Sequence, residues 1–179
     1  MTSGSIFQLT NPEIYVVTTA QGDQLAGQVA TWVSLASLVP DQPRVALVLS
    51  PCTHTSSLLR GRGSFVLQML AADQAPLLER FGLYSGYHRP KFADLEITHS
   101  DQGLPILPGT CGWAVCEVVE HVDLGDRVVW IANVSQQVCY PDRLPLRRAE
   151  ALAQLPDSVR QQLLAQRQAD IERDRQLRR

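Results

Sequence analysis

The sequence predicts a mainly β protein of the α+β type, an antiparallel barrel or sandwich with short helices and a helical C-terminal end. Runs of β-branched and aromatic residues recur at short spacing between turn residues, which is typical of antiparallel strands. These runs do not alternate with helical patterns, as the units of a parallel sheet would. With 179 residues, of which 45% are hydrophobic and 19% charged, the chain is apolar enough to bury a core and is not disordered.

The expected barrel begins with a hairpin. A β-branched and aromatic run, Ile14–Thr19, and a second strand-like run, Leu25–Leu35, flank the turn residues Gln21–Asp23. After a proline-bounded loop, Val45–Leu49 is apolar without interruption. That pattern predicts a strand that is buried on both of its faces.

After residue 50 the sequence predicts short helices and strands first, and then two long strands and two helices. A short helix is expected over Thr55–Arg60, with Thr53 or Thr55 capping its N-terminus. Pro105 and Pro108 each remove a backbone donor, so their segment cannot be an interior strand. The other expected elements are strands over 64–70, 95–99, 112–122 and 127–138, a turn over 123–126, a polar loop over 82–90, and helices over 75–81, 144–155 and 156–179.

The charged residues divide the chain into two parts. Residues 1–140 carry seven basic and twelve acidic side chains, whereas residues 141–179 carry nine basic and six acidic ones. This shift predicts a barrel domain over 1–140 and a helical C-terminal extension over 141–179. Acidic residues are interleaved with the arginines of the extension, and its apolar stripe is weak. It is therefore interpreted as a surface or partner-packing helix and not as a nucleic-acid arm.

The composition also excludes several classes of protein. A net charge of −2 argues against a basic nucleic-acid binder. The longest apolar runs have about five residues, against the ~20 of a membrane span, and residues 1–10 lack the pattern of a signal peptide. We therefore expect a cytoplasmic protein without membrane contact. The four cysteines form no CxxC pair and are interpreted as thiols, three of them in apolar strand-like stretches, with Cys52 in a polar turn as the one candidate for reactivity.

Motifs for catalysis by side chains alone are missing from the sequence. It contains no dinucleotide-binding glycine motif, no P-loop, no HExxH zinc motif and no GxSxG nucleophile elbow. The four histidines lack the spacing of metal ligands. If the protein is an enzyme, a bound cofactor should carry the reaction.

Four segments, taken in order, resemble a known family. They are Gly27–Ser37, Ser50–Ser56 with Gly63–Leu70, the pairs Phe81-Gly82, Ser85-Gly86 and Lys91-Phe92, and Gly103-Leu104-Pro105 with Gly125-Asp126-Arg127. Over about residues 10–138, this set resembles the flavin reductase-like family of FMN-binding split barrels. The family includes NAD(P)H:flavin reductases, flavoredoxins and the reductase modules of flavodiiron proteins, and the Ala-Thr-Trp-Val-Ser form looks closest to the last two. The resemblance implies an antiparallel Greek-key split β-barrel, a homodimer, and a flavin near the subunit interface.

A flavin ring calls for an apolar wall and for backbone hydrogen-bonding groups at its polar edge. By resemblance, the ring contacts come from Ala30, Thr31, Trp32, Val33 and Ser34. Trp32 is expected beside the ring, and Ser34 with the local backbone toward its polar edge. The alternatives are a core tryptophan and an ordinary strand or turn hydroxyl.

The flavin phosphate calls for hydroxyl and N–H donors at a loop or at the start of a helix. The resemblance places it at Ser50, Thr53, His54 and Thr55. Many relatives carry a lysine or arginine in this loop, but here no such residue precedes Arg60, and His54, Arg60 or Arg62 are candidates to compensate. The alternative is ordinary helix capping.

Two more positions match the family or depart from it. Lys91-Phe92 matches the family's Lys-Phe pair, where a cation near the pyrimidine edge stabilises the negative charge of reduced flavin. Without the resemblance, Lys91 would be interpreted as a solvated surface charge. Arg127 follows Gly125-Asp126 where many reductases of the family have histidine. The planar guanidinium of Arg127 suits binding of the nicotinamide phosphates. The alternative is that its side chain fills the cleft.

The resemblance leads to one main hypothesis and two alternatives. The main one is an FMN-binding oxidoreductase that takes hydride from NAD(P)H and passes electrons to a free flavin or a protein acceptor, with FAD left open as the flavin. The first alternative is a flavoredoxin-like electron carrier reduced by a partner protein. The second is a split-barrel interaction module without catalytic activity. No metal, nucleic-acid or membrane partner is expected.

Overall fold

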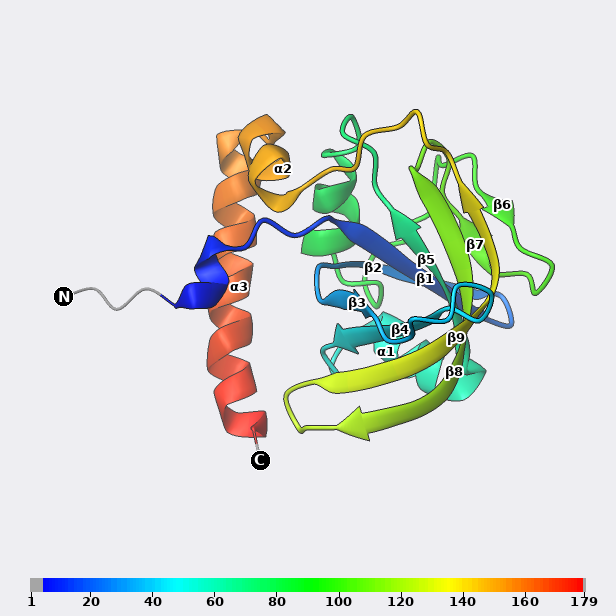
Figure 1. Cartoon of the computed structure of the whole chain (residues 1–179). Helices are drawn as coiled ribbons and strands as arrows, with labels where there is room; N and C mark the ends of the chain where they lie inside the picture. Colours follow the sequence, from blue (N-terminus) through cyan, green and yellow to red (C-terminus); the bar gives the residue numbers. More distant parts are fainter. Residues whose placement is uncertain (1–4, 179) are drawn as a thin grey trace.

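An antiparallel sheet forms the body of the protein and curls into a half-barrel (Figure 1). The computed structural model describes residues 5–178. Its elements are η1 (Ile6–Leu9), β1 (Tyr15–Gln21), β2 (Gln24–Ala30), β3 (Val33–Leu35), β4 (Arg44–Leu49), α1 (His54–Arg62), β5 (Ser64–Met69), η2 (Glu79–Leu83), β6 (Thr98–His99), β7 (Pro105–Ile106), β8 (Gly112–Asp123), β9 (Val128–Cys139), α2 (Arg148–Gln154) and α3 (Asp157–Leu177). Seven strands pair in the order β2-β1-β5-β8-β9-β4-β3, while β6 and β7 pair separately. The predicted antiparallel barrel is confirmed.

The two outer strands of the large sheet, β2 and β3, are separated in sequence by just Thr31 and Trp32. Three peptide units span about 11 Å at most, so the sheet must curl until its two edges come together. The N–H of Val48 donates to the carbonyl of Trp32 at 3.0 Å, which ties the connection to β4. The expected single strand Leu25–Leu35 is therefore wrong, because its two halves pair with different strands.

The interior of the half-barrel is apolar, and its largest buried side chains include Phe65 and Trp130. Along β4, Val45, Leu47 and Leu49 are buried, whereas the residues between them are partly buried. This alternation contradicts the expectation that the strand is buried on both faces, since one of its faces remains partly open. The hairpin β1–β2 and the long pair β8–β9 form as expected.

Helix α1 is capped at both ends by residues suited to these positions. The side-chain oxygen of Thr53 accepts a hydrogen bond from the N–H of Ser56 at 3.2 Å, so Thr53 is the N-cap. Gly63 ends the helix in the left-handed region at φ 73°, where glycine carries no steric cost. The predicted helix and its Thr53 cap are confirmed, and the short turn delivers the chain directly into β5.

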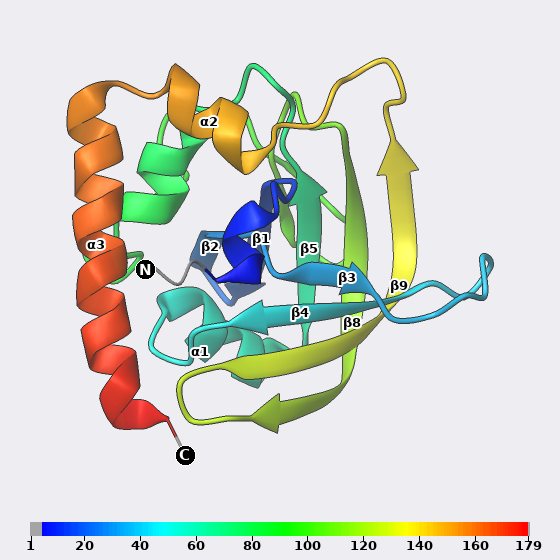
Figure 2. The same ribbon diagram turned by 60° about the vertical axis from the view of Figure 1, so that its left-hand side comes forward.

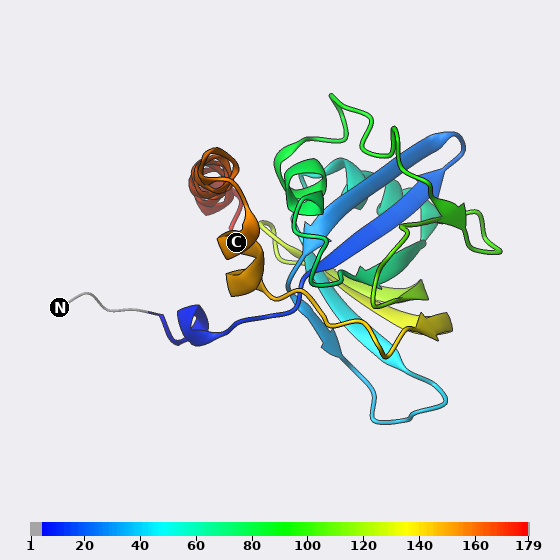
Figure 3. The same ribbon diagram turned by 90° about the horizontal axis from the view of Figure 1, so that it is seen from above.

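A second apolar core lies outside the sheet, between β1, β2 and the helices. Figure 3 shows α2 and α3 standing beside the half-barrel. The helix expected over 75–81 is wrong in position, because residues 77–83 are helical and 79–83 form a π-helix. The helix expected over 144–155 begins later, at Arg148, because residues before it run extended beside β1, where the N–H of Ile14 donates to Leu146 O at 2.9 Å.

Two smaller expectations also need correction. The strand expected over 95–99 is reduced to Thr98–His99, which pairs with Pro105–Ile106, outside the large sheet, as the prolines predict. Cys111 and Cys116 are buried as expected, but Cys139 is exposed, because the end of β9 faces away from both cores.

Leu146→Ala should lower the free energy of unfolding by about 2–5 kcal/mol, because Leu146 is fully buried in the second core. Urea denaturation measures this change. Leu144→Ala is the control, since Leu144 is 75% exposed and its truncation should change stability by about 0.5 kcal/mol or less. Equal effects of the two substitutions would contradict the packing of this segment into the core.

Candidate functional site

A cleft of about 600 Å³ opens where the curled sheet meets α3. Its walls come from the end of β2 with the 31–32 connection, the end of β4 with the start of α1, the η2 turn and one side of α3. Figure 2 shows α3 running past these elements, with its C-terminal half beside α1 and the β8–β9 turn. The volume falls within the range of ligand sites, which is roughly 300–1,000 Å³.

The loop from Ser50 to Thr55 forms one end of the cleft. Its hydroxyl groups hydrogen bond mainly within the loop. Ser56 Oγ donates to Ser50 O at 2.7 Å, and Thr53 Oγ1 caps α1. Thr55 is buried, while Cys52 is exposed at the turn. The first-turn N–H groups of α1 therefore begin at this end of the cleft, and such groups attract anions.

Lys91 enters the cleft from the loop that follows η2, and only 7% of it is exposed. Its ammonium donates to the carbonyl oxygens of Gly27 at 2.9 Å and Phe81 at 3.2 Å. Removal from water lowers its pKa to about 8. Among the described residues, no carboxylate pairs with this lysine. The alternative of a solvated surface charge is therefore wrong, and an unneutralised cation lies beside the cleft.

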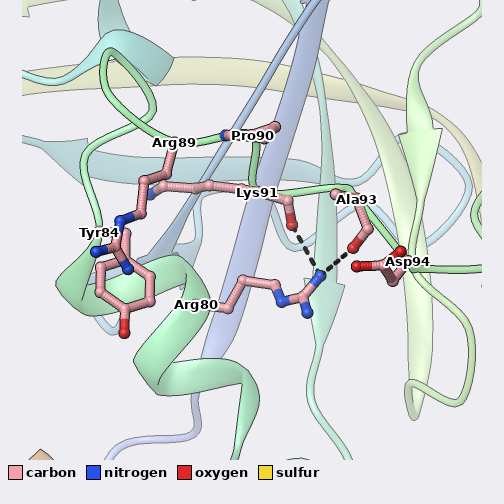
Figure 4. Close-up of a pocket in the computed structure, with 7 residues that line it drawn as sticks. All are labelled: Arg80, Tyr84, Arg89, Pro90, Lys91, Ala93 and Asp94. Atoms are coloured by element: carbon pink, nitrogen blue, oxygen red, sulfur yellow. Dashed lines mark hydrogen bonds between the residues drawn. The ribbon is translucent and has the colours of Figure 1, made fainter.

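The backbone that carries Lys91 is fixed from outside the cleft, as Figure 4 shows. Arg80 of η2 donates from Nη1 to the carbonyl oxygens of Lys91 and Ala93. Arg89 lies over the ring of Tyr84, with 4.2 Å between the guanidinium carbon and the ring centroid. These residues border a smaller hollow of about 180 Å³. Their contacts hold the loop so that the lysine side chain is directed to one place.

Two buried polar atoms in residues that line the cleft have no hydrogen-bond partner among the described residues. They are Gln28 Oε1 and His54 Nδ1. Burial, and then the charge of Lys91, lower the pKa of His54, so its ring is neutral at pH 7. A Cβ atom at Gly86 would lie 2.9 Å from His54 Nδ1, so the glycine lets the loop approach the ring. Unpaired buried atoms of this kind suit a ligand that carries its own polar groups.

Trp32 lies at the seam of the sheet and is 57% exposed, which contradicts the alternative of a core tryptophan. Arg127, the residue before β9, stacks on it, with 5.3 Å between the guanidinium carbon and the ring centroid. The same guanidinium pairs with Asp174 of α3, whose pKa is lowered by hydrogen bonds from Arg127 and Arg173 although burial opposes this shift. Arg127 thus joins the barrel to α3 across one side of the cleft.

The structure brings most of the sequence-predicted residues together and leaves three outside the lining. Those along the cleft are Ala30, Thr31, Trp32, Ser50, Thr53, His54, Thr55, Lys91 and Arg127. Val33 packs against the barrel core. Ser34 is exposed, and its hydroxyl donates to Leu35 O. Phe92 lies behind Lys91, edge-on to Phe81 with 5.5 Å between ring centroids.

Sequence reasoning missed the contribution of α3. Leu163, Gln166, Arg167, Asp170 and Arg173 all line the cleft. The sequence interpretation of the C-terminal extension relied on its weak apolar stripe, whereas most of these cleft-lining residues are polar. The excess of basic residues after position 140 was the one signal that pointed to them.

A family model described as flavin reductase like domain matches residues 9–146, which is more than half of the chain. The chain belongs to the flavin reductase-like family. Helices α2 and α3 of this flavin reductase-like chain lie beyond the matched residues. The split-barrel family expected from the sequence is confirmed.

The curated relatives of this flavin reductase-like chain include much longer proteins. It is 29% identical over 124 residues to a high molecular weight rubredoxin from Moorella thermoacetica, covering 68% of this chain and 53% of that protein. It is 30% identical over 119 residues to diflavin flavoprotein A 1 from Nostoc sp. (strain PCC 7120), covering 66% and 20%. The match therefore covers about half of the length of the rubredoxin and about a fifth of the length of the diflavin flavoprotein.

Solved structures share the fold. Nitrilotriacetate monooxygenase component B from Mycobacterium thermoresistibile superposes with a TM-score of 0.71 at 25% identity, covering 79% of this chain and 78% of that chain. An NADH:FAD oxidoreductase from Streptomyces globisporus superposes with a TM-score of 0.70 at 18% identity, covering 79% of this chain and 78% of that chain. An FMN-binding protein from Thermus thermophilus superposes with a TM-score of 0.69 at 20% identity, covering 77% of this chain and 76% of that chain.

The donor groups in the cleft fit a flavin. The ammonium of Lys91, the unpaired buried atoms and the start of α1 offer partners for a polar ring edge and a phosphate. Within residues 5–178, no group of three histidine, cysteine, aspartate or glutamate side chains gathers as metal ligands. In the same range, no helix has the length and apolarity that a bilayer crossing requires.

The burial of Lys91 should make stability depend on pH. Its pKa of about 8 in the folded protein lies below the usual 10.5, so between these pH values the unfolded chain binds more protons. Relative to Lys91→Met, the wild type should therefore gain stability as pH rises through this window, by at most about 1.4 kcal/mol per pH unit. Urea denaturation of both proteins from pH 7 to 10 measures the difference. Parallel pH profiles would show that the lysine is not buried as a cation.

Proposed function

We propose that this chain binds FMN in the cleft and acts as a flavin reductase-type oxidoreductase that uses NAD(P)H. The observation that carries the proposal is the convergence of three separate segments, the 31–32 connection, the 50–55 loop and Lys91, on one cleft of a flavin reductase-like domain. The fold shared with an FMN-binding protein and an NADH:FAD oxidoreductase supports a flavin ligand. FAD remains the competing flavin, to be separated by binding measurements.

In this proposal the chain holds and polarises the flavin. Ala30, Thr31 and Trp32 form the wall for the ring, and the N-terminus of α1 receives the phosphate. Lys91 lies near the pyrimidine edge, where its desolvated ammonium stabilises negative charge more strongly than it would in water. Bound FMN would supply the two-electron chemistry. Neutral His54 offers a hydrogen bond without adding charge.

Anaerobic mixing of the FMN-loaded protein with NADH, and separately with NADPH, tests the reductase activity. Loss of the visible flavin absorption with one or both nucleotides is expected, at a rate that saturates with nucleotide concentration. Free FMN without protein is the control. If neither nucleotide bleaches the flavin, the nicotinamide-dependent reaction is contradicted.

A second candidate, a flavoredoxin-like electron carrier, is favoured by one contact. Arg127 stacks on Trp32 and pairs with Asp174, so its guanidinium already has partners within the protein and is less available to a nicotinamide phosphate. A carrier would be bleached by a reduced ferredoxin but not by NADH or NADPH. A protein that binds no flavin at all would instead favour the interaction module.

Lys91→Met should lower the midpoint potential of the bound flavin by about 30 mV or more, because the reduced, more negative flavin loses a nearby cation worth about 1.4 kcal/mol. A redox titration of the loaded protein measures this. Arg62→Gln is the control, since it also removes one positive charge, but Arg62 does not line the cleft and donates to Gln102 O. Equal potentials in the wild type and Lys91→Met would remove the lysine from the flavin site.

We also propose that the chain forms a homodimer. The outer strand β3 and the loop that follows it expose Leu35, Leu38 and Val39 to solvent. An exposed apolar group on an edge strand is typical of a surface that another chain covers. A cytoplasmic location stays a prediction from the sequence.

A further inference from the structure

The loop proposed to receive the flavin phosphate has no cation of its own. No lysine or arginine occurs between Ser50 and Leu59. Arg60 pairs with Asp123 at 3.1 Å, and Arg62 donates to Gln102 O at 2.7 Å, so both guanidinium groups are engaged away from the cleft. Neither of these two residues therefore compensates for the missing charge.

Helix α3 brings arginines to the same cleft from outside the family domain. Arg173 lines the cleft together with Cys52 and Thr53 of the loop. It is close enough to Cys52 for an electrostatic interaction between the two groups. In Figure 2 the C-terminal half of α3 runs beside α1, and residues of both the helix and the loop line the cleft.

The position of Arg173 is fixed by a buried carboxylate. Asp174 is 7% exposed, and its Oδ1 accepts from Arg173 Nε at 3.0 Å and Nη2 at 2.8 Å, while its Oδ2 pairs with Arg127. Arg173 also pairs with Asp170 at 2.8 Å. Four arginines line the cleft, and Asp170 is the one carboxylate in the same lining. Positive side chains therefore outnumber negative ones there.

We propose that Arg173 of the C-terminal helix supplies the cation for the phosphate group of the bound flavin, so that the phosphate site is shared between the barrel loop and α3. This inference rests on the proposed flavin binding. A guanidinium has five N–H groups, and Arg173 donates three of them to Asp170 and Asp174. One N–H on Nη1 and one on Nη2 remain to donate to a phosphate. Asp174 acts as a positioning residue, because it anchors Arg173 to Arg127 and so to the barrel.

The test compares FMN with riboflavin, which has the same ring and ribityl chain but no phosphate. Binding of each is measured by quenching of flavin fluorescence in the wild type, Arg173→Gln and Arg173→Lys. Arg173→Gln should weaken FMN binding by about tenfold to a hundredfold and change riboflavin binding by less than about threefold. Arg173→Lys should restore part of the FMN affinity. Unchanged riboflavin binding shows that the substituted protein keeps a folded ring site.

The matched control is Arg175→Gln, because Arg175 lies on the same helix but is exposed and pairs with Glu172. It should leave the affinities for both flavins unchanged. Unchanged affinities for both FMN and riboflavin in Arg173→Gln would overturn the role of Arg173 and leave flavin binding standing. An equal loss of affinity for both flavins would also overturn that role, because α3 would then act through packing. A wild type that binds neither flavin would overturn the proposed function and this inference with it.

Discussion

The connection of Thr31 and Trp32 between the two outer strands of the sheet is the constraint on which the remaining architecture depends. Two residues cannot bridge a flat seven-stranded sheet, so the strands must curl until β2 and β3 nearly meet. This closure sets the end of β4 and the start of α1 beside the end of β2, which makes the cleft. Because the Trp32 carbonyl is tied to Val48, its side chain stays at the seam, outside the core.

The cleft concentrates positive charge in a protein whose net charge is negative. Lys91 and the arginines of α3 and β9 reach it from three parts of the chain, and their partners differ in kind. Lys91 bonds to carbonyl dipoles, which hold it without cancelling its charge. Arg127 and Arg173 share Asp174, and Arg173 also pairs with Asp170, so carboxylates offset much of the charge of these two arginines. An incoming anion would therefore meet a full charge at Lys91 and an attenuated charge at the arginine pair.

The barrel and much of the cleft followed from the sequence, because strands and turns are local and Lys91 sits in a recognisable pair. The break at Thr31–Trp32 could not be found, since Leu25–Leu35 is continuously strand-like and only pairing with β1 and β4 separates its halves. The contribution of α3 was hidden because polar residues such as Gln166, Arg167 and Arg173 form most of its side of the cleft. A hydrophobic period reports burial of apolar faces and does not detect such contacts.

The bonds that hold Lys91 also change the open edge of the sheet. β2 is the last strand of the sheet, and an outer strand offers carbonyl and N–H groups to any other extended chain. The ammonium of Lys91 donates to the Gly27 carbonyl on that strand, so this acceptor already has a partner within the chain. One side chain therefore places a cation beside the cleft and occupies a backbone acceptor on the sheet edge.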